Sequence, residues 1–481
     1  MALRAKVLQK KAEKFELKKL QVLKVDKEKV LALEPLLQDV YANRRPKPAE
    51  YEVRRDLIRV FNDIAKEIYG HSKDIPVVLE FGSFVMDLFS TSSDLDLSVN
   101  FKTTTVPFPR EKKIQTLRKF AKKLYAIQSK GHIYGVLPIT TAKVPILKCV
   151  DRGTGVECDI SVENRDGILK SQIIHIISSV DERFPKLSFL FGTCVIYCCI
   201  CMMSTDMSPQ MKTWAKSYNI NSSKDKTLNS LSIILLVAFH LQTRDPPILP
   251  PFSSIFKDGT DPETVVKSVS NFVNYGKQNR ESLAELFVTL LIKLSSVEKL
   301  WPKGLCASTR SGTWTSKTWD SKVACISVED FTDPSQNVAR AVGQAEVKRI
   351  YKCIDISIRH VFAFMDGKIG AEVKDILFGK DGIRSITRRV ETGKRKKQVM
   401  YTGSARTTRI FHQDQDTVDE SGLAKKMRIG PGNVEESIGT GYDPTRRQTG
   451  GWEGNWQPSG GGWEGTTPQQ LDAGGWGGKS W

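Results

Sequence analysis

The sequence lacks a convincing zinc-binding set of cysteines and histidines, and no continuous hydrophobic run opens it. Six histidines and nine cysteines are present, and none of them follows the spacing of a zinc-binding set. The region 2–24 is rich in lysine and contains Glu13 and Glu16, so we expect no secretory signal peptide. Reduced, structural cysteines in a nuclear or cytosolic protein are therefore the expectation.

Acidic residues are in the minority. Asp and Glu number 54 against 72 Lys and Arg, which gives a formal net charge of +18. A basic excess favours a polyanionic partner, because counterions released from phosphates drive such binding. Nucleic acid is the first candidate, although ribosomal and membrane-surface proteins share this composition. The 481 residues, 40% of them hydrophobic, are enough for two or three domains with sizeable cores.

The most informative motif joins a Gly-Ser turn to a pair of carboxylates. An apolar run at 76–79 predicts a strand that enters Gly82-Ser83, and residues 84–89 predict a short helix that leaves it. Such a turn lets phosphates approach the backbone and the Ser hydroxyl. Asp94 and Asp96 lie two residues apart in the next predicted strand and share one of its faces. Two close carboxylates repel unless divalent cations lie between them, so the motif predicts a two-metal phosphoryl-transfer site.

A third carboxylate follows in a predicted hairpin. Residues 143–150 and 156–162 read as strands, and the sequence Asp-Arg-Gly-Thr-Gly at 151–155 reads as their turn. The second strand carries Asp159 between Cys158 and Ile160. Beside Asp94 and Asp96, it could complete the metal site and accept the proton of an attacking hydroxyl. Most Asp-x-Asp triplets belong to solvated strand edges, but here the Gly-Ser turn, the spacing and the third Asp agree.

Together these motifs resemble the DNA polymerase β-like nucleotidyltransferase superfamily, and within it the noncanonical poly(A) polymerases and terminal uridylyltransferases. The nearest resemblance is to the plant small-RNA terminal uridylyltransferases. The likeness runs from about residue 33 to about 359 and is carried by the segments FGSFVMDLF, SDLDLSV, AKVPILK, ECDISVEN, KTWAKSYNIN, TLNSLSIILLVAFHLQ and PPILPPF. It implies that Asp94, Asp96 and Asp159 bind Mg²⁺ or Mn²⁺, and that Gly82 and Ser83 hold the triphosphate. An RNA 3′-hydroxyl would then attack the α-phosphate of a nucleotide without a template.

The resemblance implies an α+β fold, in which a mixed-sheet nucleotidyltransferase domain lies beside a helical poly(A) polymerase-type central domain. Helical spacing over 52–69 predicts a helix that packs into the helical domain, and residues 111–128 predict one that lies on the sheet. Residues 228–241 are apolar enough for a buried core helix rather than a membrane span. The predicted parts are a basic N-terminal helix or extension (1–30), a helical segment of the central domain (31–70), the catalytic domain (71–165), the helical nucleotide-recognition domain (166–378), a basic linker (379–440) and a disordered tail (441–481).

The nucleotide pocket follows from the resemblance residue by residue. Lys212 and Lys216 match lysines that grip the triphosphate in relatives, and their i, i+4 spacing aims both at one target. Ordinary exposed lysines of an amphipathic helix would show the same spacing. Ser230 matches a pocket serine, but Leu231 replaces the aromatic residue that usually follows it and stacks on the base.

The far wall of this pocket is predicted in the stretch EDFTDPSQN. Asp330 and Asp333 stand where acidic residues line the base pocket of relatives. Gln336 replaces the histidine that favours uracil over adenine in some of them. Preference for UTP over ATP therefore depends on the overall likeness and not on that residue.

A twenty-residue segment at 191–210 departs from the family pattern. It contains Cys194, Cys198, Cys199 and Cys201 in an apolar run. Three interpretations of this segment compete: a membrane segment, a redox or metal cluster, and an insertion from alternative splicing or an imperfect gene model. The run is too short for a bilayer and lacks metal-site spacing, so we favour an insertion. It directly precedes Lys212, so it could displace the triphosphate lysines and inactivate the enzyme.

The C-terminal region changes in composition after about residue 379. Residues 384–409 hold a run of basic residues typical of a nuclear-import signal, an RNA-binding arm or a solvated linker. Trp452, Trp463 and Trp476 each follow a glycine in a background of Gly, Pro, Gln and Ser. Exposed tryptophans in a disordered chain require a partner with pockets. The repeats resemble the hooks that dock into Argonaute proteins, while stacking on RNA or condensation is the alternative.

These patterns together predict an RNA 3′-terminal uridylyltransferase that uses UTP, acts on small RNAs, and is recruited by Argonaute to promote small-RNA decay. A noncanonical poly(A) polymerase that uses ATP and a catalytically impaired Argonaute-binding scaffold are the alternatives. We expect a monomer without membrane contact, located in the cytoplasm and nucleus, with P-bodies as an option.

Overall fold

The computed structural model describes residues 2–70, 72, 74–102, 108–205, 228–319 and 326–379. Its described elements, in chain order, are α1 (Ala2–Leu23), α2 (Lys27–Leu31), α3 (Glu34–Arg44), α4 (Pro48–Tyr69), β1 (Val77–Phe81), β2 (Leu95–Asn100), α5 (Arg110–Ser129), β3 (Ile133–Ile139), β4 (Ile146–Asp151), β5 (Glu157–Val162), α6 (Arg165–Ile177), α7 (Arg183–Thr205), α9 (Ser230–Gln242), α10 (Phe252–Ile255), α11 (Pro262–Ser270), η1 (Tyr275–Gln278), α12 (Leu283–Ser296), η2 (Glu298–Lys303), β6 (Leu305–Ser308), β7 (Thr313–Ser316), α13 (Gln344–Met365) and α14 (Val373–Phe378).

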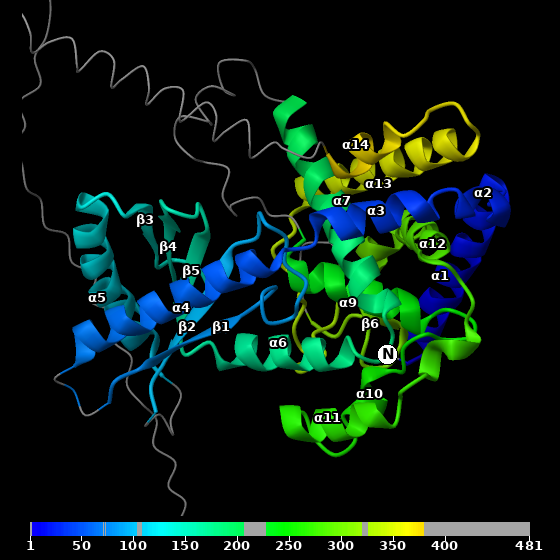
Figure 1. The fold of residues 1–481 in the computed structure, drawn as a ribbon. Helices are drawn as coiled ribbons and strands as arrows, with labels where there is room; N and C mark the ends of the chain where they lie inside the picture. The colour runs from blue at the N-terminus through cyan, green and yellow to red at the C-terminus, as the bar shows by residue number, and fades with distance from the viewer. Residues whose placement is uncertain are drawn as a thin grey trace, which may run out of the picture. The chain divides into compact units, whose positions relative to one another are not determined.

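A mixed five-stranded sheet forms the first core. Its strand order is β1-β2-β5-β4-β3, and only the β2–β5 pair is parallel. Alternation along the strands divides the side chains between two faces. Leu147, Cys149, Cys158 and Ile160 belong to the apolar cluster beneath α4 and α5, which lie along the sheet in Figure 1. The predicted α+β class and the hairpin at 143–162 are confirmed.

Helix α4 lies on the sheet and not in the helical domain, so that part of our prediction is wrong. Its apolar residues Leu57, Phe61 and Ile64 join the cluster of the sheet. The segment that does belong to the helical domain is the preceding α3, through Leu37 and its neighbours. Helical periodicity identifies the buried face of a helix but not its partner, which explains the error.

A second core unites the remaining helices and the small β6–β7 hairpin. Helix α9 is buried along most of its length, as predicted, and begins where the Asn229 side chain accepts a hydrogen bond from the Ser232 amide at 2.7 Å. Among the described helices, none is long and apolar enough to span a membrane.

Of the two predictions for residues 1–30, a basic helix or an extension, the helix is confirmed as α1. Its residues Leu8 and Ala12 are buried in the helical core, and it packs against α12 and the β6–β7 hairpin. The Glu16 carboxylate lies 3.1 Å from the buried ammonium of Lys293 on α12. The N-terminal helix is therefore part of the folded domain.

Candidate functional site

The predicted acidic residues meet where β2 and β5 run side by side. Asp96 on β2 and Asp159 on β5 are register partners in the parallel pair. Asp94 lies two residues before Asp96, directly ahead of the strand. The antiparallel partner of Asp159 on β4 is Lys148. Strand register thus gathers Asp96, Asp159 and Lys148 on the sheet face opposite α4 and α5, and Asp94, at the entry to β2, lies close enough to raise the pKa of both other carboxyls.

Burial and mutual repulsion make these carboxylates difficult to ionise. The pKa of Asp96 is raised well above its usual range by burial and by the charges of Asp94 and Asp159. Burial also raises the pKa of Asp94, while the Lys148 charge opposes the shift. For Asp159, burial raises the pKa to about 6 despite the nearby Lys148. Lys148 thus offsets only part of the negative charge of the cluster, and a bound cation would supply the remainder.

Lys148 is a site residue that our sequence reasoning missed. Its ammonium donates to both carboxylate oxygens of Asp159 at 2.7 Å and to Glu157 at 2.8 Å, and only 5% of its side chain is exposed. The signal was present in the sequence, because Lys148 interrupts an apolar strand that pairs with the strand of Asp159. A buried lysine in such a position requires an acidic partner.

The donor set fits a hard divalent cation. Carboxylate oxygens are the ligands that Mg²⁺ and Mn²⁺ prefer, and the raised pKa of Asp96 marks a site short of positive charge. Among the residues that the structure describes, no three His, Cys, Asp or Glu side chains are grouped closely enough to hold a metal as they lie. Both oxygens of Asp159 face Lys148 instead. Metal ligation by the three Asp residues therefore stays a prediction.

Gly82 lies in direct contact with the acidic cluster. Its φ of +71° belongs to the left-handed region, and a Cβ added there would lie 2.1 Å from Oδ2 of Asp96. Its amide donates to the Ser171 hydroxyl at 2.7 Å. The chain that follows forms turns over 82–87 and not the predicted helix, and Asp87 also has a positive φ. The groups that can donate hydrogen bonds to a phosphate are therefore the amides of this turn and the hydroxyl of the half-buried Ser83, and not the amides of a helix N-terminus.

The predicted base-pocket residues differ in accessibility. Asp330 is buried, and its Oδ2 accepts a hydrogen bond from Lys170 at 2.6 Å. Asp333 is exposed and accepts hydrogen bonds from the amide and hydroxyl of Ser335. Ser230 is exposed as the first residue of α9. The Gln336 amide oxygen accepts a hydrogen bond from Lys143 at 3.2 Å.

Several predicted residues lie outside the described part of the chain. These are the triphosphate lysines, the basic run and the tail tryptophans, namely Lys212, Lys216, residues 384–409, Trp452, Trp463 and Trp476. Their roles therefore stay predictions.

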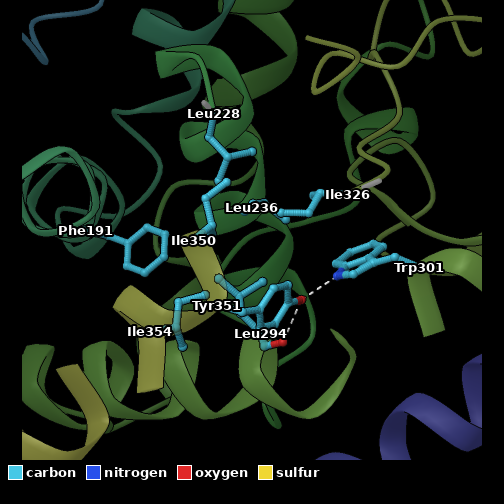
Figure 2. Close-up of a pocket in the computed structure, with 9 residues that line it drawn as sticks. All are labelled: Phe191, Leu228, Leu236, Leu294, Trp301, Ile326, Ile350, Tyr351 and Ile354. Carbon is cyan, nitrogen blue, oxygen red and sulfur yellow. Dashed lines mark hydrogen bonds between the residues drawn. The ribbon is translucent and has the colours of Figure 1, made fainter. Parts of the chain in front are cut away.

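The atypical segment at 191–210 begins inside the folded core. Residues 191–205 continue α7, and Phe191 and Cys194 are buried. In Figure 2, Phe191 lines a small apolar cavity together with Leu228, Trp301 and Tyr351. The Trp301 indole donates to the Tyr351 hydroxyl, which donates to the Leu294 carbonyl at 3.1 Å. The first turn of the segment is thus a core element and not a surface loop.

Comparisons with known proteins agree with this architecture. The family model "Poly(A) RNA polymerase, mitochondrial-like, central palm domain" matches residues 33–179. Protein HESO1 of Arabidopsis thaliana is 33% identical over 351 residues, which cover 68% of this chain and 64% of that protein. Human terminal uridylyltransferase 4 is 30% identical over 232 residues, which cover 45% of this chain and 13% of that protein.

Poly(A) RNA polymerase GLD2 of Danio rerio is 28% identical over 269 residues, which cover 54% of this chain and 49% of that protein. The chain therefore spans less than two thirds of the length of each of these relatives. The crystal structure of mtPAP in complex with UTP superimposes with a TM-score of 0.54 at 17% identity, over 74% of each chain. This structural likeness shows a shared fold.

Proposed function

Because the chain belongs to the family of noncanonical poly(A) polymerases and terminal uridylyltransferases, we propose that it adds nucleotides to RNA 3′ ends without a template. UTP is the proposed donor. The observation that carries the proposal is the parallel pairing of Asp96 with Asp159, beside Asp94 and the Gly82 turn. This arrangement brings three carboxylates to a turn that can receive phosphates.

Each acidic residue has a proposed role. Asp94 and Asp96 would hold Mg²⁺ or Mn²⁺, and Asp159 would share one ion and accept the proton of the RNA 3′-hydroxyl. The bound ions would neutralise charge on the triphosphate and on the attacking oxygen. The 3′-oxygen then forms a bond to the α-phosphorus, the bond to the bridging oxygen breaks, and pyrophosphate leaves. Ser83 and the turn amides would hold the terminal phosphate.

Small RNAs are the proposed substrate, and Argonaute is the proposed partner. The support is the sequence likeness together with the Gly-Trp repeats at Trp452, Trp463 and Trp476. A spacing of eleven residues separates Trp452 from Trp463; as a flexible coil it would span roughly 18 Å, so that two hooks could engage neighbouring pockets. Decay of small RNAs in the cytoplasm and nucleus would follow from their uridylation.

A noncanonical poly(A) polymerase is the second candidate. It is favoured by the matches to poly(A) polymerases and by Gln336, which replaces the histidine expected for uracil selection. The third candidate is a catalytically impaired scaffold for Argonaute. It is favoured by Leu231 and by the atypical segment at 191–210.

Extension of a labelled, unmethylated small RNA tests these alternatives. The full chain is incubated with each nucleoside triphosphate and Mg²⁺ or Mn²⁺, beside the double variant Asp94→Asn/Asp96→Asn. Addition of uridine that the double variant loses supports the proposal, whereas addition of adenosine selects the poly(A) polymerase. A folded wild-type protein that extends no RNA under any of these conditions points to the scaffold.

A further inference from the structure

Helix α6 connects two parts of the candidate site. One is the turn at Gly82 and Ser83, which we call the phosphate turn, and the other is the segment Val328–Asn337, which we call the base loop. Its Ser171 hydroxyl accepts a hydrogen bond from the Gly82 amide at 2.7 Å and donates to the Gly167 carbonyl at 2.7 Å. Gly167 allows α6 to approach the end of β1, since a Cβ there would lie 3.0 Å from the Phe81 ring. One face of α6 is therefore fixed to the phosphate turn.

The residue before Ser171 fixes the base loop. Lys170 donates to Oδ2 of Asp330 at 2.6 Å and to Oδ2 of Asp166 at 2.6 Å. The Lys170 and Asp330 side chains are only 9% and 6% exposed, whereas Asp166 is 66% exposed. The buried pair with Asp330 is thus the stronger constraint, because solvent screens the contact with Asp166.

Asp330 in turn organises its own loop. Its Oδ1 accepts hydrogen bonds from the Thr332 amide at 3.1 Å and hydroxyl at 2.9 Å. Its amide donates to the Gln336 carbonyl at 3.1 Å. With its carboxylate oxygens occupied in this way, Asp330 supports the loop. The exposed Asp333, whose Oδ1 accepts from Ser335, and the half-buried Gln336, whose amide oxygen accepts from Lys143, are the more accessible groups of the loop toward a base.

Building on the proposed function, we propose that Lys170 is a positioning residue for nucleotide selection. Through Lys170 and Ser171, two consecutive residues of one helix, α6 fixes the base loop relative to the turn that receives the triphosphate. A nucleotide must reach from one to the other. The Lys170–Asp330 pair therefore determines which base fits between the base loop and the phosphate turn. It does so without contacting the reacting atoms.

The test compares Lys170→Met with the charge-retaining variant Lys170→Arg. The matched control is Lys186→Met on α7, which also removes an i, i+4 pair, with Glu182 at 2.8 Å. For each full-length protein we measure thermal unfolding, equilibrium binding of UTP and of ATP, and kcat and KM for RNA extension. Lys170→Met should raise KM for the preferred nucleotide about tenfold and reduce, by a similar factor, the ratio of kcat/KM for the preferred nucleotide to that for the other one.

In the same experiment, kcat should change less than KM, Lys170→Arg should recover part of the selectivity, and Lys186→Met should behave as wild type. Loss of Lys170 leaves the buried Asp330 without its cation and could unfold the protein. If Lys170→Met does not fold, the double variant Lys170→Met/Asp330→Asn, which removes both charges, is measured in its place. A folded double variant with wild-type KM and wild-type nucleotide ratio overturns the proposal.

Failure of the proposed function is recognised separately. A wild-type protein that binds neither nucleotide and extends no RNA refutes that function before any variant is compared. A wild-type protein that prefers ATP leaves the inference testable, because the prediction concerns the change in the ratio and not its initial value.

Discussion

Two features of the structure require a glycine at position 82, namely its positive φ and its close approach to Asp96. The substitution Gly82→Ala, compared with a matched control, separates their effects. At a φ of +71°, a residue with a Cβ costs about 1–2 kcal/mol of stability. In addition, the new Cβ would lie 2.1 Å from Oδ2 of Asp96. The carboxylate must move from 2.1 Å to the ordinary contact distance of 3.4 Å, which is about 1.3 Å. A misplacement of about 1 Å in an active site can reduce the rate about 100-fold.

Gly367→Ala is the matched control. Gly367 has a φ of +70°, and no atom lies within 4 Å of its added Cβ. Both variants should show a similar loss in the free energy of unfolding from backbone strain, measured in urea or by heat. Only Gly82→Ala should lose about two orders of magnitude in kcat for RNA extension. Activity of Gly82→Ala within threefold of wild type would refute the contact between Gly82 and Asp96.

Three further predictions concern charge and packing. In metal-free protein, burial raises the pKa of Asp159 from 3.8 to about 6, so its stabilising contribution is present below pH 4 and lost as pH rises through 6. Asp159→Asn should make the decline in unfolding free energy over this range smaller, while Asp94 and Asp96, whose pKa values are also raised, keep their own part of it. Mg²⁺ should raise the melting temperature of the wild type but not of Asp96→Asn, because bound metal stabilises only the folded state; calorimetry with and without chelator checks this. Ala12→Arg should cost about 2 kcal/mol or more by overpacking the buried face of α1, whereas the exposed Lys14→Ala should have little effect in chemical denaturation.

Strand patterning made much of the site predictable. Alternation placed Asp94 and Asp96 together, and the Gly-rich turn at 151–155 fixed the hairpin that carries Asp159. These features depend on local periodicity and turn chemistry, which a sequence displays directly. The α+β class followed from the same patterns and from the family resemblance.

The sequence-based predictions were wrong or incomplete where contacts between distant parts of the chain determine the structure. The apolar spacing of α4 is the same whether it covers a sheet or another helix, so its partner was assigned wrongly. Residues 84–89 have helical composition, but the positive φ values at Gly82 and Asp87 confine the chain to turns. The pair between Lys170 and Asp330 joins residues 160 positions apart, and a single sequence contains no signal for such a pair.

The docking of α1 has a consequence for the order of folding during synthesis. The Arg4 side chain donates to the Lys303 carbonyl at 2.9 Å, across 299 residues of chain. At about 5–20 residues per second, the ribosome needs roughly 15–60 s to supply that partner. The sheet and its two covering helices span the continuous segment 48–162, so they can form early. The buried face of α1 must wait, exposed to chaperones, until the helical core is complete.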